Sequence, residues 1–210
     1  MADENGQASQ ADKETVSIKD WFDVHSDQPL NELDSPPALA YAASDPKDAA
    51  RELFALVCDP KQPPRHEQVS TMHRVDQPGI IRVVDWKVID WPLEERRCPV
   101  LIYERPRGKR VTDSIESSIT VSSEDSLIQN FIKPVATALR EIDHQNLTHR
   151  AIRPTNLFYD SVSVPQATIM LGECLASPPA MNQPAAYEPV ESALASSSGR
   201  GLGTISDDLY

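Results

Sequence analysis

The residues whose types and spacing could do chemistry are concentrated between positions 149 and 159, which read His-Arg-Ala-Ile-Arg-Pro-Thr-Asn-Leu-Phe-Tyr. This stretch combines an imidazole, two guanidinium groups and an amide, contributed by His149, Arg150, Arg153 and Asn156. Such side chains supply the hydrogen-bond donors and acceptors that active sites use. The position after the His-Arg pair holds Ala151, whose methyl group can neither accept a proton nor orient a hydroxyl group.

A long amphipathic helix and a hairpin are predicted to position this stretch. Ser123 is a favourable N-cap and is followed by two acidic residues in the first turn. Apolar residues then recur at spacings of three and four, at Leu127, Ile128, Phe131, Ile132, Val135, Ala138, Leu139 and Ile142. Pro134 lies inside this pattern, where proline costs about 3 kcal/mol, so a kink is expected there. On the other side, residues 157–159 and 168–171 are predicted to pair as strands around 160–166.

The first half of the chain is predicted to be a β-rich lobe. Residues 21–34 mix apolar and acidic side chains without a clear period, and Pro36-Pro37 then breaks the chain. Short apolar runs bounded by turn residues indicate strands, and Val69, Met72 and Val75 indicate one short helix over 65–75. The predicted strands cover residues 38–43, 52–58, 80–84, 86–89 and 99–103.

Composition narrows the possible functions. The net charge of −12 makes nucleic acid a poor partner. No stretch approaches the ~18 apolar residues that a membrane helix needs. Residues 1–16 are polar and acidic, unlike a secretory signal, and predict a disordered tail. Three cysteines without metal-ligand spacing fit a reducing cytoplasm, the predicted location.

The order of a β-rich lobe, a linker, a long helix, a His-Arg loop and a hairpin resembles the protein kinase fold. Kinases carry H-R-D-L-x-x-x-N where this chain has His149-Arg150-Ala151-Ile152-Arg153-Pro154-Thr155-Asn156. Residues 187–191 resemble a degenerate A-P-E element, and residues 206–210 resemble the start of the next large helix. The resemblance implies that Asp208 anchors the backbone of the catalytic loop.

The fold expected from the resemblance is an α+β, protein kinase-like one. It would comprise a small N-terminal lobe over residues 17–104 and an incomplete helical C-terminal lobe over 105–210. In the complete fold, further helices would cover part of the helix over 127–142, which is apolar on more than one face. The chain is therefore expected to expose an apolar surface, to bind a partner, or to be a fragment of a longer protein.

Each element that handles phosphate in the resembling family is altered in this chain. Ala151 replaces the carboxylate that accepts the proton of the substrate hydroxyl group. Gly172 replaces the metal-binding aspartate, and Glu173 follows it either as a metal ligand or as an exposed loop residue. Val57 or Cys58 stands where the phosphate-binding lysine belongs. No glycine occurs between Gly6 and Gly79, and Pro36-Pro37 lies near the expected tip of the glycine-rich loop.

The residues that are retained have structural and functional interpretations. His149 is expected to pack and to bond the backbone. Arg150 is expected to pair with Glu173 or Glu188. Asn156 is expected to bond the loop backbone, and its alternative role is that of a metal ligand. Trp86 and Trp91 are expected to provide core and rim packing.

The resemblance therefore favours a pseudokinase, a kinase-like domain without phosphotransfer that acts as a regulatory or protein-binding module. No metal or cofactor is expected. The alternatives are an atypical ATP-dependent serine/threonine protein kinase that binds ATP and magnesium through Asn156 and Glu173, or an incomplete fragment of a larger kinase-like protein. The expected partner is a protein, with no membrane segment in this chain.

Overall fold

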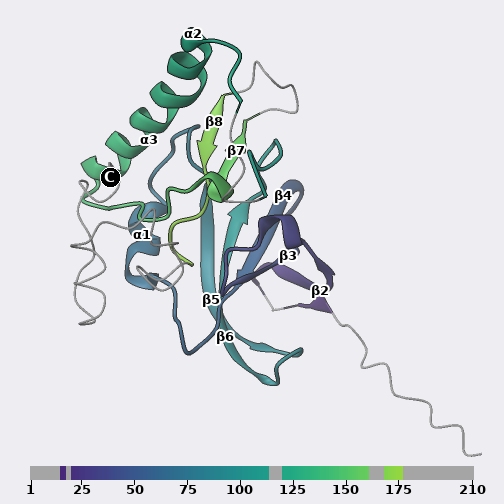
Figure 1. Ribbon diagram of the computed structural model, residues 1–210. Helices are drawn as coiled ribbons and strands as arrows, with labels where there is room; N and C mark the ends of the chain where they lie inside the picture. The colour runs from purple at the N-terminus through teal and green to yellow at the C-terminus, as the bar shows by residue number, and fades with distance from the viewer. Residues whose placement is uncertain (1–14, 18–19, 114–119, 161–167, 177–210) are drawn as a thin grey trace, which may run out of the picture.

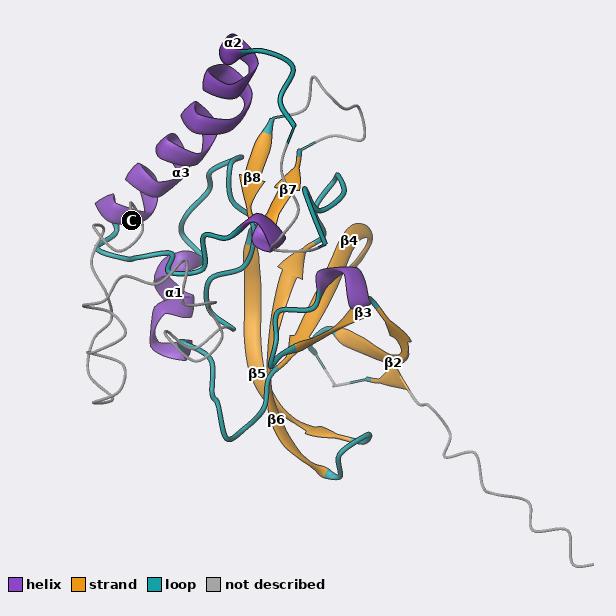
Figure 2. Ribbon diagram, viewed as in Figure 1, coloured by secondary structure: helices purple, strands orange, loops and turns teal. Residues whose placement is uncertain are grey.

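A six-stranded antiparallel sheet, a long helix and a two-stranded hairpin between them make up the computed structural model (Figures 1 and 2). The structure describes residues 15–17, 20–113, 120–160 and 168–176. The strands of the large sheet are ordered β1-β2-β3-β4-β6-β5. Their bounds are Thr15–Val16, Asp23–Pro29, Leu39–Asp45, Asp48–Val57, Val83–Trp91 and Arg96–Glu104 for β1 to β6 in chain order.

Most predicted strands are confirmed, with shifted ends. Residues 80–84 and 86–89 belong largely to one strand, β5, which pairs with β6 along its length and carries a register shift between Val83 and Asp85. Residues 21–34, for which the pattern without a clear period predicted no particular element, contain strand β2. Strand β2 forms there because β1 and β3 supply hydrogen-bonding partners on both sides. Its alternation was concealed because Ser26, a polar residue, shares the buried face with Val24.

Two further boundaries differ from the prediction. Thr15–Val16 pair with β2, so the end of the predicted tail is a strand, and residues 1–14 lie outside the described residues. The predicted helix over 65–75 is only a 3-10 turn, His66–Gln68, followed by the single turn α1, Val69–Met72. Its three apolar residues are nevertheless buried as the spacing predicted. The division of the chain into lobes at residues 104 and 105 stays a prediction.

The predicted long helix is confirmed and is irregular near its proline. It comprises α2 (Glu124–Leu127), a π-helical turn (Ile128–Ile132) and α3 (Lys133–His144). Ser123 caps it by accepting a hydrogen bond from the backbone N–H of Ser126 at 3.1 Å. Pro134 has no N–H to donate, so the helical ladder is interrupted beside it, and a π-turn is one way to accommodate such a break.

The predicted hairpin is also confirmed. Strand β7 (Leu157–Tyr159) pairs antiparallel with β8 (Ile169–Leu171), and a 3-10 turn, Pro154–Asn156, leads into it. The hairpin is connected to the large sheet because Leu171 lies beside the segment before β5. The N–H of Leu171 donates to the carbonyl of Gly79 at 2.7 Å, and the N–H of Ile81 donates to the carbonyl of Leu171 at 2.9 Å.

The two faces of the large sheet pack into separate hydrophobic clusters. Along β4, Leu53, Ala55 and Val57 face one cluster, which also contains Trp91. Alternate residues, Phe54 and Leu56, with Cys58 just beyond the strand, face the other cluster. This second cluster continues through the hairpin to the buried face of α3, and it therefore joins the strands to the stretch that follows the helix.

Candidate interlobe site

The stretch singled out by the sequence lies between the end of α3 and the start of β7, and much of it is buried. His149 is fully buried, and its Nε2 lies 3.1 Å from the carbonyl oxygen of Gly172. Its Nδ1 accepts a hydrogen bond from the backbone N–H of Ala151 at 3.2 Å. Burial, helped by the charges of Arg65 and Arg153, lowers the pKa of His149 from 6.5 to about 3. A neutral histidine bonded to backbone on both nitrogens holds the loop in shape.

Two neighbours of this histidine show how tightly the loop is built. Ala151 is buried, so a carboxylate at this position would meet protein rather than open solvent. Arg150 is also buried and has a left-handed backbone with φ of 57°. Non-glycine residues adopt that conformation rarely, and it occurs mainly where the surrounding structure imposes it. The expected pairing of Arg150 with Glu173 or Glu188 stays a prediction, and Glu188 lies outside the described residues.

Asn156 uses its side-chain amide to join two segments of backbone. Its Nδ2 donates to the carbonyl oxygens of Ala151 and Glu173, both at 2.8 Å. The backbone carbonyl of Asn156 accepts a hydrogen bond from the N–H of Gly172 at 2.8 Å. These are the hydrogen bonds expected of a residue that fixes the loop to the end of β8, and they surround the amide with protein groups.

Glu173 is buried, and its interpretation as an exposed loop residue is wrong. The side chain is 3% exposed. Its Oε2 accepts the backbone N–H groups of Leu175 and Ala176 at 3.0 and 2.7 Å, and its Oε1 accepts the hydroxyl group of Ser35. No local pattern indicates this burial, because the amides and the hydroxyl group that solvate the carboxylate are supplied by the fold.

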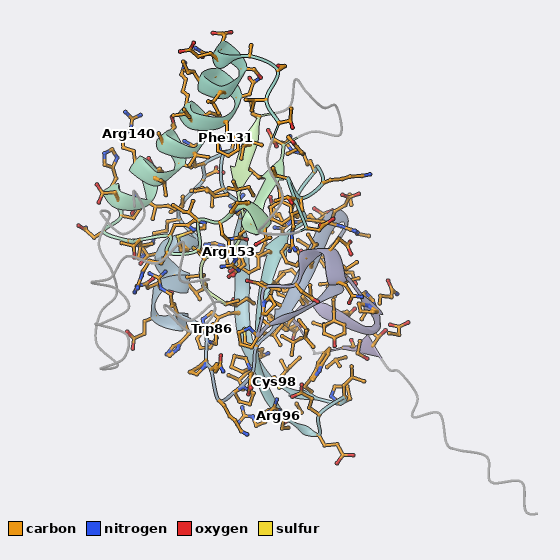
Figure 3. The ribbon with its side chains drawn as sticks, viewed as in Figure 1. Trp86, Arg96, Cys98, Phe131, Arg140 and Arg153 are labelled. Atoms are coloured by element: carbon orange, nitrogen blue, oxygen red, sulfur yellow. The ribbon has the colours of Figure 1, made fainter. Side chains whose placement is uncertain are left out.

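Arg153 completes a buried polar cluster with Ser35 and Glu173. It lies near the middle of the molecule (Figure 3), and its Nη2 donates to Oγ of Ser35 at 3.3 Å. Burial lowers the pKa of Arg153, while the charge of Glu173 opposes that shift. We call these three residues the Ser35 cluster. It links the segment between β2 and β3 to residues 149–156 and to the residues after β8.

Arg110 also contacts the segment between β2 and β3. Its Nη2 donates to the backbone carbonyl of Asp34 at 3.0 Å, and its guanidinium carbon lies 5.6 Å from the ring centroid of Phe158. A guanidinium over an aromatic face is an attractive arrangement. The Pro36-Pro37 peptide bond, which is cis, lies next to this contact. The segment before the expected place of a glycine-rich loop is thus held by polar contacts with Arg110, Arg153 and Glu173.

The strand that should carry a phosphate-binding lysine presents an uncharged residue instead. Cys58 directs its buried side chain toward the cluster that includes the hairpin, whereas Val57 packs on the opposite face. Burial and the nearby charge of Glu173 raise the pKa of the Cys58 thiol, so it stays protonated. Lys61, which follows the strand, and Glu67, in the turn before α1, are both exposed.

Arg65 is a structural residue of the site that the sequence analysis did not identify. Its Nη1 donates to the carbonyl oxygens of Thr148, His149 and Cys174 at 2.9, 3.3 and 3.2 Å. Its backbone N–H also donates to the carbonyl of Leu175 at 2.8 Å. One arginine from the segment before α1 therefore joins the His-Arg stretch to the residues after β8. No local pattern marks it, because its partners are backbone groups distant in sequence.

Some predicted features cannot be compared with the structure. Asp208 and the degenerate element at 187–191 lie outside the described residues. Within the described residues, no group of three or more His, Cys, Asp or Glu side chains could hold a metal ion. No helix among those residues has the length and hydrophobicity required to cross a membrane. Trp91 is buried against Tyr41, and Trp86 is partly buried beside the ring of His66, consistent with core and rim packing.

Comparison with solved structures identifies the fold. The kinase domain of Mycobacterium tuberculosis PknI superposes with a TM-score of 0.62 at 18% identity, covering 89% of this chain and 68% of that one. A point mutant of the same domain gives the same TM-score at 17% identity. Rad53 residues 1–466, solved in complex with AMP-PNP, gives a TM-score of 0.59 at 13% identity, covering 81% of this chain and 43% of that one. No family model and no curated protein matches the sequence.

The chain therefore has a protein kinase-like fold of the α+β class, as the order of motifs predicted. It spans less than half of the Rad53 chain that it matches. At these identities the similarity establishes the fold alone, and function has to be argued from the site.

Proposed function

We propose that this chain is a pseudokinase, a kinase-like domain without phosphotransfer that acts by binding another protein. The observation that carries the proposal is the set of hydrogen bonds that the carboxylate of Glu173 accepts. This carboxylate directly follows the position of the metal-binding residue in the resembling family, and it accepts hydrogen bonds from Ser35, Leu175 and Ala176. A carboxylate that accepts two backbone amides and a hydroxyl group would lose those bonds on turning toward a metal ion.

The remaining parts of the site support the same proposal. Phosphoryl transfer depends on positioned metal ions, a phosphate-binding lysine and a residue that accepts or orients the proton. Ala151 and Cys58 supply neither of the latter two functions, and Asn156 is bonded to two backbone carbonyls. The contacts of Arg110 and Arg153 fix residues 34–35, which precede the expected place of a glycine-rich loop. We therefore expect no bound ATP or magnesium.

Exposed apolar residues on the long helix support a protein-binding role. Ile128 and Ile132 lie one turn apart and are 42% and 50% exposed, whereas Ala138, Leu139 and Ile142 are buried. Neighbouring exposed apolar residues favour contact with another protein surface. The free, buried cysteines Cys58, Cys98 and Cys174 are compatible with the proposed cytoplasmic location.

Thermal unfolding with and without Mg-ATP tests the proposal. We expect the midpoint to stay within about 1 °C at millimolar nucleotide, since a ligand that does not bind the native state cannot stabilise it. A rise of several degrees would show that the site takes nucleotide. A transfer assay with radiolabelled ATP completes the test, with Glu173→Ala as the comparison. Phosphotransfer by the natural chain that this substitution abolishes would establish the atypical kinase instead.

A further inference from the structure

A separate cavity on the structure is lined by three arginines. It has a volume of about 350 Å³, a size typical of small ligand sites, and lies beside the segment that precedes β5. Arg82, Arg105 and Arg107 line it together with two acidic residues and an apolar floor that includes Ile81 and Met170. We call it the arginine pocket. Among its lining residues, three are arginines and two are acidic, although the net charge of the chain is −12.

The backbone beneath the pocket is fixed by the sheet. The N–H of Glu104 donates to the carbonyl of Arg82 at 2.9 Å, and the N–H of Arg105 donates to the carbonyl of Glu52 at 2.8 Å. Ile81 is held by its hydrogen bond to Leu171. Two of the three arginines therefore project from strand ends whose positions are set before any ligand arrives, which reduces the entropy cost of binding.

The arginines retain most of their hydrogen-bonding capacity. Among the described residues, each makes one ion pair through one nitrogen: Arg82 with Glu104 at 4.0 Å, Arg105 with Glu32 at 3.1 Å and Arg107 with Asp160 at 2.5 Å. These guanidinium side chains are 42%, 42% and 68% exposed. Exposed pairs of this kind contribute little to stability, so an incoming anion can replace or share them at little cost.

We propose that the arginine pocket binds a phosphorylated side chain of a partner protein. A phosphoseryl group carries nearly two negative charges and three acceptor oxygens, which match three guanidinium groups better than a single carboxylate does. The apolar floor accommodates the carbon atoms beside the phosphate. A phosphate polymer fits poorly, because the surrounding chain is strongly acidic and repels extended negative charge. The proposal rests on the proposed binding role and specifies its partner chemistry.

Fluorescence anisotropy with the full chain tests this assignment. The probe is a short labelled peptide of alanine and leucine with one central phosphoserine, compared with otherwise identical peptides that carry serine or glutamate. We expect the phosphoserine peptide to bind at least about tenfold more tightly than either, because only phosphate engages all three arginines. Equal binding of the serine peptide would overturn the proposal. Equal binding of the glutamate peptide would replace it with a general acidic site.

Variants locate the binding site. Arg82→Gln combined with Arg105→Gln should weaken phosphoserine binding by about tenfold or more. Arg97→Gln is the matched control, since its 73% exposed side chain lies at the opposite end of the β5–β6 pair and each substitution removes the same kind of charge. An equal loss in this control, or no loss in the double variant, would overturn the assignment.

A second variant covers the possibility that the double variant unfolds. Arg107→Gln removes only one exposed ion pair and should still weaken binding severalfold. Unchanged binding in this variant would remove Arg107 from the site and overturn the three-arginine assignment. Failure of the peptide experiment leaves the absence of phosphotransfer untouched, because that is measured separately with ATP.

Discussion

The side chain of Asn156 occupies the space in which a side chain at Gly172 would begin. A Cβ atom added to Gly172 would lie 2.0 Å from Oδ1 of Asn156, and the N–H of Gly172 donates to the carbonyl of Asn156 at 2.8 Å. In the resembling kinase motif, position 172 would carry the metal-binding aspartate. Here the retained asparagine and the lost aspartate are physically linked, because this conformation of Asn156 requires a glycine opposite it.

This contact predicts that Gly172→Ala destabilises the protein by about 1–3 kcal/mol, the usual cost of overpacking a buried site. Gly79→Ala is the matched control, since its Cβ would lie 3.2 Å from its nearest neighbours, a tight contact with far less overlap. Urea unfolding at neutral pH measures both. Equal free energies of unfolding for the two variants would contradict the interpretation.

Restoring the catalytic carboxylate should not restore catalysis. In Ala151→Asp the new carboxylate would be buried, and Gly172 and Cys58 would still stand where the family carries an aspartate and a lysine. We therefore expect no transfer of radiolabelled phosphate above background and a lower stability, because burying an unpaired charge is unfavourable. Ala151→Ser serves as the uncharged comparison. Measurable phosphotransfer by the aspartate variant would show that the rest of the site is functional.

Arg65 should contribute more to stability than a typical surface arginine. Arg65→Ala removes a charged donor from three backbone carbonyls, and we expect a loss of about 2–4 kcal/mol in the free energy of unfolding. Arg97→Ala should change it by less than about 0.5 kcal/mol, because its ion pair with Asp90 is exposed and long, at 3.9 Å. Equal losses in the free energy of unfolding for the two variants would contradict the role of Arg65 in joining the His-Arg stretch to the residues after β8.

The buried histidine predicts a specific dependence of stability on pH. The pKa of His149 is about 3 in the native state and 6.5 in the unfolded chain. Between these values the unfolded chain binds one more proton than the native state, so stability falls as the pH is lowered from 6.5 toward 3. The loss approaches about 1.4 kcal/mol per pH unit. Above pH 6.5 the protein retains its full stability with respect to this group.

Urea unfolding between about pH 7 and pH 5 measures this dependence. His149→Asn removes the backbone hydrogen bonds of the imidazole, so the variant should be less stable at neutral pH. It also removes the titrating group, so the variant should lose less stability on acidification than the natural chain. Parallel pH profiles for the two proteins would show that His149 is not the group responsible.

Local patterns in the sequence were sufficient for the elements whose stability depends on near neighbours. The spacing from Leu127 to Ile142 predicted the long helix, Ser123 predicted its cap, and the runs around 160–166 predicted the hairpin. The motif order then predicted the protein kinase-like fold that comparison with solved structures confirms. These signals are readable because helix periodicity, capping and turn chemistry act over a few residues.

Local patterns of this kind do not predict strand β2 or the burial of Glu173. Strand β2 depends on partners in β1 and β3, and its polar buried residue Ser26 conceals the alternation. Glu173 would be exposed on any local argument, since carboxylates are seldom buried unless they are paired. Its acceptance of a bond from Ser35, which lies 138 residues away, follows only from the assembled fold.

The sequence by itself determined which chemical groups are missing from this protein. Ala151, Cys58 and Gly172 carry neither a carboxylate nor an amine, so the sequence directly shows that they differ from the motif residues of the resembling family. Only the tertiary structure decided what replaces them, because the Ser35 cluster, the bonds of Arg65 and the arginine pocket join segments far apart in the chain. Hydrogen bonds and ion pairs depend on distance in space, which sequence separation does not specify.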